Sequence, residues 1–398
     1  MAQGIKTRRD LRPEIKPKHF VFTSRWHKTQ PSTMLERLDD SLGKNFVASV
    51  GAIAGYSDFD SLPIISDLKQ CNLNNGIVTA YEEDPNFTYT PVNGDVMLEI
   101  PKFYCKISPE DPSYTDFSIS TTPIDSNYIV SPAHMDRGDG QGERNKVYLA
   151  LFPNTTGNRS IGSGSVLVNT NRTAFRTSIR ARGNGYNIWD LPMWWTIRLL
   201  YLIEVANWNS QTVIGAGRTF TQATPTFLAN GTTTNVAWHS GRSSGTDDQV
   251  GVKYHGIENL WGNISQYVDG VNYYNGSIYV AINPSNFGEK TTNGHRLLSY
   301  TVPTSGMGDF IQAYGHDAEY PWAMLPININ GGSYSTFVPD GYYVQPQVEP
   351  YATGWEWLYT GGEVNHGTGA GLFSNIFYGH SQDAYASVGA RMMFLPDN

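Results

Sequence analysis

Apolar residues recur with helical spacing in one part of the chain, residues 172–208. Residues 174–182 place apolar side chains one turn apart, and Gly183 follows as a residue suited to a left-handed helix end. A second apolar run, residues 191–205, starts behind Asp190, whose side chain can cap a helix. The pattern predicts two helices, and the wide apolar stripe of the second predicts that it packs on a core.

Four arginines lie on or directly after the first predicted helix: Arg172, Arg176, Arg180 and Arg182. One interpretation is a binding site for an anion. A row of cations on one helix is more typical of a charged face in solvent, so we expect a solvated face.

The rest of the chain has the short apolar pieces and turn residues of strands and loops. Residues 46–90 alternate such pieces with polar turns, which indicates a small β-rich module. Residues 96–107 are rich in β-formers but contain Pro101, which predicts an edge strand or a bulge. We expect further short strands at residues 146–152 and 165–168.

Composition also indicates a turn-rich globular protein. Only 16% of the 398 residues are charged, 13% are aromatic, and there are 40 glycines and 22 prolines, which excludes a coiled coil or helical bundle. Gly, Asn, Ser, Thr and aromatic residues dominate from residue 209 onward, so we expect many loops there. The net charge of −8 argues against a nucleic-acid-binding protein.

Basic residues are concentrated at the N-terminus. Residues 1–30 contain eight Lys or Arg and two acidic residues. They form either a solvated tail or an arm that docks on an acidic partner, and we expect residues 1–45 to be an attachment arm. The apolar runs are too short or too interrupted for a signal peptide or a membrane span, which predicts a protein made in a cytoplasm without membrane insertion.

Metal and disulfide chemistry have little support in the sequence. Cys71 and Cys105 are too few for a disulfide framework, and their spacing predicts no zinc site. Asn263 and Asp269 offer two oxygens that could hold calcium, but calcium takes six to eight ligands. We therefore expect these side chains to cap backbone groups, and no cofactor.

Three motifs follow the predicted helix pair in a fixed order. They are GIENLWGNISQYVDG at residues 256–270, the turn Gly331-Gly332-Ser333-Tyr334 and the final segment Gly389-Ala390-Arg391-Met392. Gly256, Gly262 and Gly270 would permit tight turns, while Leu260, Trp261 and Val268 would fill the core beneath them.

This ordered set resembles the C-type-lectin-like fold shared by formylglycine-generating enzymes and phage receptor-binding proteins. The resemblance implies an α+β fold with two helices packed on a small, twisted, mostly antiparallel sheet, a strand start at the second motif and a last strand at the third. The implied lectin-like domain is residues 91–398, after the arm at 1–45 and the module at 46–90. Residues 96–106 and 204–217 also look like phage tail-fibre or tail-tip proteins.

The two sides of the resemblance imply different functions. The formylglycine-generating enzymes use a C-terminal cysteine pair, and this chain has no cysteine after Cys105, so we do not expect an enzyme of that kind. Glycan hydrolysis is a second alternative, because Glu356 lies between two tryptophans and Glu363 lies near His366. Chance alone gives such pairs in a long chain, and we expect no catalysis.

A binding function is favoured by the C-terminal region, which mixes aromatic residues with Asn, Ser and Gly as antibody binding sites do. The candidate receptor-binding residues are Trp355, Trp357, Tyr359, Asn365, His366, Asn375, Tyr378, His380, Ser381, Asp383, Tyr385 and Ser387. Those from Asn375 to Ser387 precede the last strand, where the variable residues lie in the similar major tropism determinants and other variable proteins of diversity-generating retroelements. The alternative is that the apolar members of this region are core and the polar ones ordinary loop.

We therefore expect a phage or prophage tail protein that binds a bacterial surface receptor, either glycan or protein. The resemblance implies a homotrimer in the virion, attached to other tail proteins through the arm. An insertion at residues 284–330 would widen the binding face or build a subunit contact; it contains Tyr300, Phe310, Tyr314, His316, Tyr320 and Trp322. Alternatives are a virion-associated glycan-degrading enzyme, a structural tail or baseplate protein without a receptor, and a variable protein displayed by a bacterium.

Overall fold

The computed structural model describes residues 19–345, 354–379 and 383–398. The fold is mixed α+β with few helices: 12% of the chain is helical and 35% is strand. This confirms the expected class. No helix in the described part of the chain is both long enough and apolar enough to cross a membrane.

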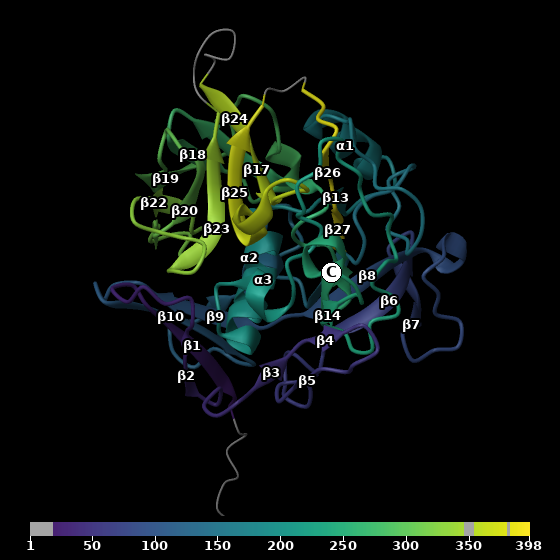
Figure 1. The fold of residues 1–398 in the computed structure, drawn as a ribbon, viewed down its shortest axis with the longest axis horizontal. Coiled ribbons are helices and arrows are strands. Elements are labelled where there is room, and N and C mark those ends of the chain that lie inside the picture. The colour runs from purple at the N-terminus through teal and green to yellow at the C-terminus, as the bar shows by residue number, and fades with distance from the viewer. Residues whose placement is uncertain (1–18, 346–353, 380–382) are drawn as a thin grey trace, which may run out of the picture.

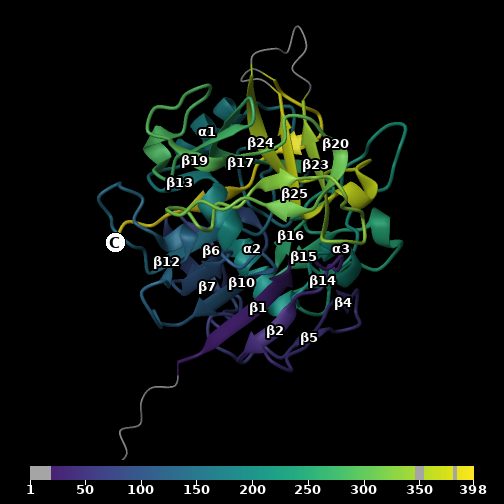
Figure 2. The same cartoon turned by 90° about the vertical axis from the view of Figure 1, so that its left-hand side faces the viewer.

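Both predicted helices are present. Helix α1 (Arg172–Arg180) starts behind Asn171, whose side chain accepts a hydrogen bond from the Ala174 amide. Helix α2 (Leu191–Val205) starts behind the predicted cap Asp190, whose side chain accepts a bond from the Met193 amide. Every residue of α2 is buried, because the helix contacts β17 on one side and β1 and β10 on the other (Figures 1 and 2). A third, short helix is α3 (Ser210–Val213).

The largest sheet has eight strands and carries the upper part of the molecule in Figure 1. Its path is β19 (Arg296–Thr301), β18 (Ser277–Val280), β17 (Ser265–Tyr274), β24 (Trp355–Gly361), β25 (Gly371–Tyr378), β23 (Val338–Val344) and β20 (Met307–Ile311), with β26 (Val388–Gly389) paired to β17. Neighbouring strands are mostly antiparallel, although β23 and β25 run parallel.

The expected insertion is part of this sheet, since residues 284–330 supply both of its outer strands, β19 and β20. Trp322 and Tyr314 lie in the core, and the Tyr314 ring stacks on that of Trp208 at 5.7 Å. These aromatic residues of the insertion therefore pack inside the molecule and offer little surface to a partner.

A six-stranded sheet pairs the C-terminal strand β27 with strands from residues 69–188. Its order is β13 (Tyr186–Ile188), β27 (Met392–Phe394), β12 (Lys146–Ala150), β8 (Asp95–Pro101), β6 (Lys69–Asn74) and β7 (Ile77–Tyr81). A domain boundary near residue 90 would lie between β7 and β8 in the chain and would therefore cut this sheet between the paired strands β6 and β8. The predicted edge position of residues 96–107 is wrong: β8 lies between β12 and β6, and Pro101 is tolerated because it is the last residue of the strand.

The N-terminal residues that the structure describes form a sheet, so the predicted arm is wrong for residues 21–39. Their five-stranded sheet has the order β11 (Ile129–Val130), β9 (Tyr104–Ser108), β10 (Tyr114–Ser120), β1 (Val21–His27) and β2 (Glu36–Asp39). Trp26 of β1 is buried and packs edge-on against Trp208. Residues 1–18, which hold six of the eight Lys and Arg residues of the segment 1–30, lie outside the described residues.

The remaining elements are short. The other strands are β3 (Phe46–Val47), β4 (Ser49–Val50), β5 (Tyr56–Ser57), β14 (Gly241–Arg242), β15 (Val252–Tyr254), β16 (Ile257–Glu258), β21 (Ala313–Tyr314) and β22 (Pro326–Asn328). Short 3-10 helices lie at Pro91–Asn93, Pro132–His134, Asp247–Gln249, Pro284–Asn286 and Gly367–Gly369. The strand expected at residues 165–168 is reduced to one isolated bridge between Val166 and Thr155.

The three motifs have different outcomes. Gly256, Gly262 and Gly270 all have φ between +69° and +78°, and the core role of Leu260, Trp261 and Val268 is confirmed. The strand start expected at Gly331–Tyr334 is wrong, because these residues form a turn, Tyr334 is 61% exposed, and β23 begins only at Val338. The last segment does form strands, β26 and β27.

The expected solvated face of α1 is also wrong. Arg172 and Arg176 are buried and form ion pairs with Asp269 and Glu289, which lie far away in the sequence. Asp269 lies in strand β17, where its carboxylate is an ion-pair partner and also accepts a hydrogen bond from the Gly270 amide. Asn263 does bind backbone as predicted: its side chain accepts from the Leu228 amide and donates to the Leu228 carbonyl.

Candidate functional site

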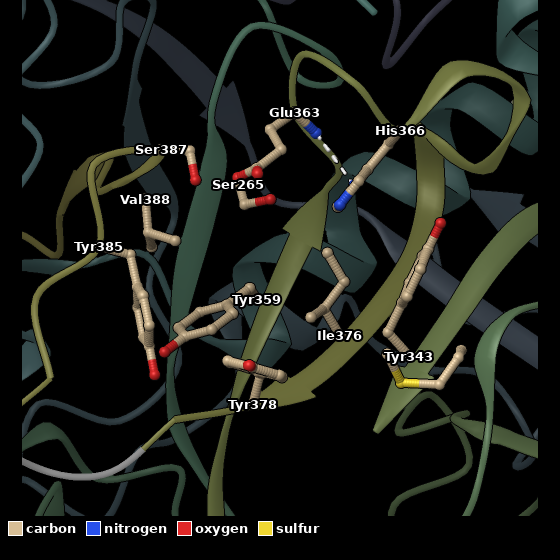
Figure 3. A pocket seen from close by; sticks show the side chains of 11 residues that line it. Ser265, Tyr343, Tyr359, Glu363, His366, Ile376, Tyr378, Tyr385, Ser387 and Val388 are labelled. Atoms are coloured by element: carbon tan, nitrogen blue, oxygen red, sulfur yellow. Dashed lines mark hydrogen bonds between the residues drawn. The ribbon is translucent and has the colours of Figure 1, made fainter. Parts of the chain in front are cut away.

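A pocket of about 290 Å³ opens on the eight-stranded sheet beside the C-terminal segment (Figure 3). Its floor is a row of three side chains on adjacent strands. Ile376 of β25 is the register partner of Tyr359 on β24 and of Tyr343 on β23, so the three lie side by side. The full lining is Ser265, Met307, Tyr343, Tyr359, Glu363, His366, Ile376, Tyr378, Tyr385, Ser387 and Val388.

One wall of the pocket consists of tyrosine rings. Tyr385 packs edge-on against Tyr378, with ring centroids 5.7 Å apart, and against Tyr359 at 6.3 Å. The Tyr385 hydroxyl donates a hydrogen bond of 2.8 Å to the Asp383 carboxylate, which fixes the ring at the rim. Tyr359 is only 2% exposed, whereas Tyr378 and Tyr385 are half-buried and keep surface toward the opening.

The opposite wall is a stacked pair of His366 and Tyr343, with ring centroids 4.9 Å apart and planes inclined by 14°. The Glu363 amide donates to Nδ1 of His366 over 3.3 Å, so this nitrogen is an acceptor and carries no proton. Burial lowers the pKa of His366 to about 4. The imidazole is therefore neutral at physiological pH and offers polarity without charge.

Glu363 supplies the one carboxyl group among the lining residues. Figure 3 shows its side chain directed toward Ser265 and Ser387. Burial raises the pKa of Glu363 to about 7, against the opposing effect of these two hydroxyl groups. Near neutral pH the carboxyl group thus exists in both forms, and it can donate or accept a hydrogen bond.

The pocket combines broad aromatic faces with a few polar groups that have defined positions. Its described lining contains no lysine or arginine, so it offers nothing to neutralise an anionic ligand. Flat apolar faces with a small number of hydroxyl, carboxyl and imidazole groups suit an uncharged, ring-shaped and hydroxyl-rich molecule.

The structure brings together part of the predicted receptor-binding set. Tyr359, His366, Tyr378, Tyr385 and Ser387 line the pocket. Asp383 lies behind it, as the partner of Tyr385.

The other predicted residues lie elsewhere. Trp355 packs against Tyr274, and Asn365 accepts a bond from the Gln222 amide outside the pocket. Trp357 and Asn375 are buried in the core, at 1% and 0% exposure, and present no surface to a receptor in this structure. His380 and Ser381 lie outside the described residues.

The alternation of side chains along a strand explains why Asn375 does not reach the pocket although its neighbour Ile376 does. Asn375 neighbours Ile376 on β25, and successive side chains of a strand point to opposite faces of the sheet. Ile376 therefore faces the pocket, and Asn375 faces inward, where its amide donates to the Phe373 carbonyl.

Sequence reasoning missed Tyr343 and Met307, which come from β23 and β20 on the far side of the pocket. The pair Tyr342 and Tyr343 carried a usable signal. In a strand with one buried face, one of two adjacent tyrosines must face outward, and here Tyr342 is fully buried while Tyr343 reaches the pocket.

The carboxylates considered for glycan hydrolysis do not meet. Glu356 is fully buried within β24, whereas Glu363 lies in the pocket. A two-carboxylate hydrolase needs both groups beside one glycosidic bond. Comparison with known proteins adds no assignment, because no protein-family model and no curated protein matches the chain.

Proposed function

We propose that the protein is a receptor-binding protein of a phage or prophage tail and that the tyrosine pocket binds a sugar of the bacterial surface. The observation that carries the proposal is the convergence of four tyrosines, one carboxyl group and one neutral imidazole on a single open pocket. Aromatic rings cover the apolar face of a sugar, while the polar groups bind its hydroxyls.

The pocket favours a neutral sugar over an acidic one. Above pH 7 the Glu363 carboxylate repels a uronic acid or a phosphorylated sugar, and no cation in the described lining offsets this repulsion. The Ser265 and Ser387 hydroxyls add groups that both donate and accept. A hexose or an N-acetylated hexosamine has the matching chemistry.

The proposal includes a C-type-lectin-like domain and a homotrimer. Both parts rest on the resemblance of the sequence motifs to those of the lectin-like family. Weak binding at one pocket would then be strengthened by three copies on one tail. Variation by a diversity-generating retroelement is part of the same proposal, because Tyr378, Asp383, Tyr385 and Ser387 line or support the pocket just before the last strands. A near-copy of this coding segment beside a reverse-transcriptase gene would support it.

A glycan-degrading enzyme is the second candidate, favoured by the raised pKa of Glu363, as in a general acid. The lack of a second carboxyl group among the described lining residues favours binding instead. Reducing-sugar release from host envelopes by the purified protein, abolished in Glu363→Gln, would show that the enzyme is the correct alternative.

The test is binding of the labelled, purified protein to a panel of bacterial strains. Tyr378→Ala and Tyr385→Ala should each weaken strain-selective binding about tenfold or more, the usual loss for a central aromatic contact. Tyr56→Ala is the matched control, because Tyr56 is 51% exposed but lies on β5, outside the pocket. Competition with neutral sugars prepared from the envelope of a bound strain should displace the protein.

Equal binding by both pocket variants and the control would contradict a receptor site in this pocket. Binding to no strain would favour the structural tail role. Each variant is first compared with the wild type by circular dichroism, so that a loss of binding is not a loss of fold.

A further inference from the structure

A second cluster of polar side chains lies at the C-terminal end of α2. Glu204 comes from the last turn of α2, His239 precedes β14, and His255 lies in the turn between β15 and β16. Each residue offers one atom suited to a metal ion, and these atoms lie within 4.8 Å of one another. The three residues belong to separate elements, so the fold and not a local motif brings them together.

The two imidazoles are held in position by their surroundings. Their rings stack with centroids 4.0 Å apart and planes inclined by 14°. Nε2 of His255 lies 2.7 Å from Oε2 of Glu204. Nε2 of His239 lies 2.9 Å from a carboxylate oxygen of Asp60, whose other oxygen accepts a bond from the Trp238 indole.

Glu204 itself provides an independent observation. Its side chain is fully buried, and its Oε1 makes no hydrogen bond of normal geometry to the described residues, although the hydroxyl groups of Ser57 and Tyr254 lie close to the carboxylate. A buried carboxylate oxygen without a partner is costly, and a bound cation is one way to satisfy it. His255 has a φ of +47°, an uncommon backbone conformation for a residue with a side chain, so the turn places its imidazole at an energetic cost.

The cluster is accessible from solvent. His239, His255 and Asp60 line a pocket of about 280 Å³, together with Gln70, Glu82 and Glu83. Glu204 lies behind the two histidines and does not line this pocket. An ion bound between the buried carboxylate and the histidines would therefore have an open side toward the pocket.

We propose that Glu204, His239 and His255 form a binding site for a divalent transition-metal ion, with zinc the best match. Two imidazoles and one carboxylate are ligands typical of zinc. Calcium and magnesium bind through oxygen atoms, so this set of ligands suits them less well. Ligand atoms around one tetrahedral zinc lie roughly 3.4 Å apart, given bonds of about 2.0–2.1 Å. The lone pair of an imidazole nitrogen lies in the plane of its ring, so the two stacked rings would have to turn out of their parallel arrangement to point at one ion.

Asp60 acts as a positioning residue in this site. Metal-binding histidines commonly donate their second ring N–H to a carboxylate, which fixes the ring and its tautomer. The contact between Nε2 of His239 and Asp60 supplies this arrangement, and it leaves Nδ1, which now lies 2.8 Å from the Ser240 hydroxyl oxygen, as the nitrogen that would bind the ion. With three protein ligands, the fourth position of the ion faces the pocket, where a water molecule or a partner's side chain can bind.

The test uses the purified full chain, freed of metal by a chelator and titrated with Zn²⁺ and with Co²⁺. We expect one ion per chain, a rise in the melting temperature and the visible absorption bands of four-coordinate cobalt. His239→Ala and His255→Ala should each weaken binding at least tenfold. Asp60→Asn should weaken it about tenfold while keeping the cobalt spectrum, which a merely structural role would not predict.

His27→Ala is the control, because His27 also pairs with a glutamate, Glu36, but is more exposed and does not belong to the cluster. Glu204→Gln is informative only if it folds, whereas His239 is partly exposed and its replacement tests the site without emptying the core. Binding of no ion by the wild type would overturn the proposal. Equal binding by wild type, His239→Ala and His255→Ala would overturn it as well.

Discussion

Asp269 holds Arg176 through two parallel hydrogen bonds inside the protein, Nε to Oδ2 at 2.8 Å and Nη2 to Oδ1 at 2.7 Å. Both side chains are buried, and the pair joins α1 to β17, the strand that carries Ser265 of the pocket. Arg172 lies 3.9 Å from the same carboxylate and also binds Glu289. The ion pair therefore connects the helix to the sheet that carries the candidate site.

Asp269→Asn should lower the free energy of unfolding by about 3–5 kcal/mol, because the two buried arginines would then share the single carboxylate of Glu289 and one positive charge would be uncompensated. Urea denaturation at pH 7 measures the change. The control is Asp116→Asn, which removes the same two-bond geometry from Arg25 at a partly exposed position and should cost about 1 kcal/mol or less. Equal losses in the two variants would contradict the importance of burial.

The same pair predicts a pH dependence. Burial by itself would raise the pKa of Asp269, but Arg176 and Arg172 outweigh it and lower the pKa to about 2. The depressed pKa contributes stability above the ordinary pKa near 4, and this contribution is lost as pH falls toward 2. Acid unfolding of Asp269→Asn should accordingly show a weaker pH dependence between pH 4 and 2 than that of the wild type.

Arg391→Lys should destabilise the protein by about 2–4 kcal/mol, although it preserves the charge. The buried Arg391 guanidinium donates to the carbonyls of Ala150, Leu151 and Glu258 and to the side chain of Gln266. A lysine ammonium cannot span these four acceptors, so buried carbonyls lose their partners. Thermal unfolding checks this.

Arg296→Lys serves as the comparison for Arg391→Lys, because Arg296 is 35% exposed and pairs with the carboxylates of Asp317 and Glu319. Its replacement should change stability by less than about 1 kcal/mol. A loss at Arg391 no larger than at Arg296 would contradict the role given to the four buried acceptors.

Local signals predicted the elements that depend on local interactions. Asp190 and the apolar run behind it identified α2, since a cap and its helix are neighbours in sequence. The environment of α1 could not be predicted in this way. Arg176 reads as a surface cation until Asp269, 93 residues further on, is known to lie beside it.

The residues of the candidate site also divide into those that lie close together in the sequence, which were predicted, and those that come from distant strands, which were not. Tyr378, Tyr385 and Ser387 are close in sequence and were predicted together, and they do line one pocket. Tyr343 comes from a parallel neighbour strand, a pairing that no nearby turn specifies. Pro101 misled the prediction for β8, because its position at the last residue of a central strand depends on where the chain leaves the sheet.

Gly262→Ala should destabilise the protein by about 2 kcal/mol more than Gly142→Ala. Both glycines have similar positive φ values, +69° and +65°, so alanine costs a comparable backbone strain at each. A Cβ at Gly262 would lie 2.8 Å from the Arg218 amide nitrogen, whereas a Cβ at Gly142 would meet nothing within 4 Å. Chemical denaturation measures the free energy of unfolding of both variants, and the difference between their losses reports the close contact at Gly262. Equal losses of stability would contradict the importance of this contact.

Glu363→Gln should stabilise the protein at pH 8 but not at pH 4. Because the folded pKa of about 7 is above the ordinary value of 4.5, the folded state binds a proton that the unfolded state releases. Wild-type stability therefore falls as pH rises from about 4.5 to 7 and then levels off. Glutamine stays neutral, so its advantage should grow over this interval to roughly 2 kcal/mol, allowing for partial exposure.

Urea denaturation of wild type and Glu363→Gln at several pH values measures the difference between their free energies of unfolding. All other titrating groups are the same in both proteins, so their contributions cancel from this difference. Glu143→Gln is the control, because it makes the same substitution at a half-exposed position outside the pocket. A constant difference between wild type and Glu363→Gln from pH 4 to 8 would contradict the raised pKa. The same variant tests the pocket: if the carboxyl group binds sugar hydroxyls in either protonation state, Glu363→Gln should keep most of its binding to a neutral sugar, while a hydrolase would lose its activity.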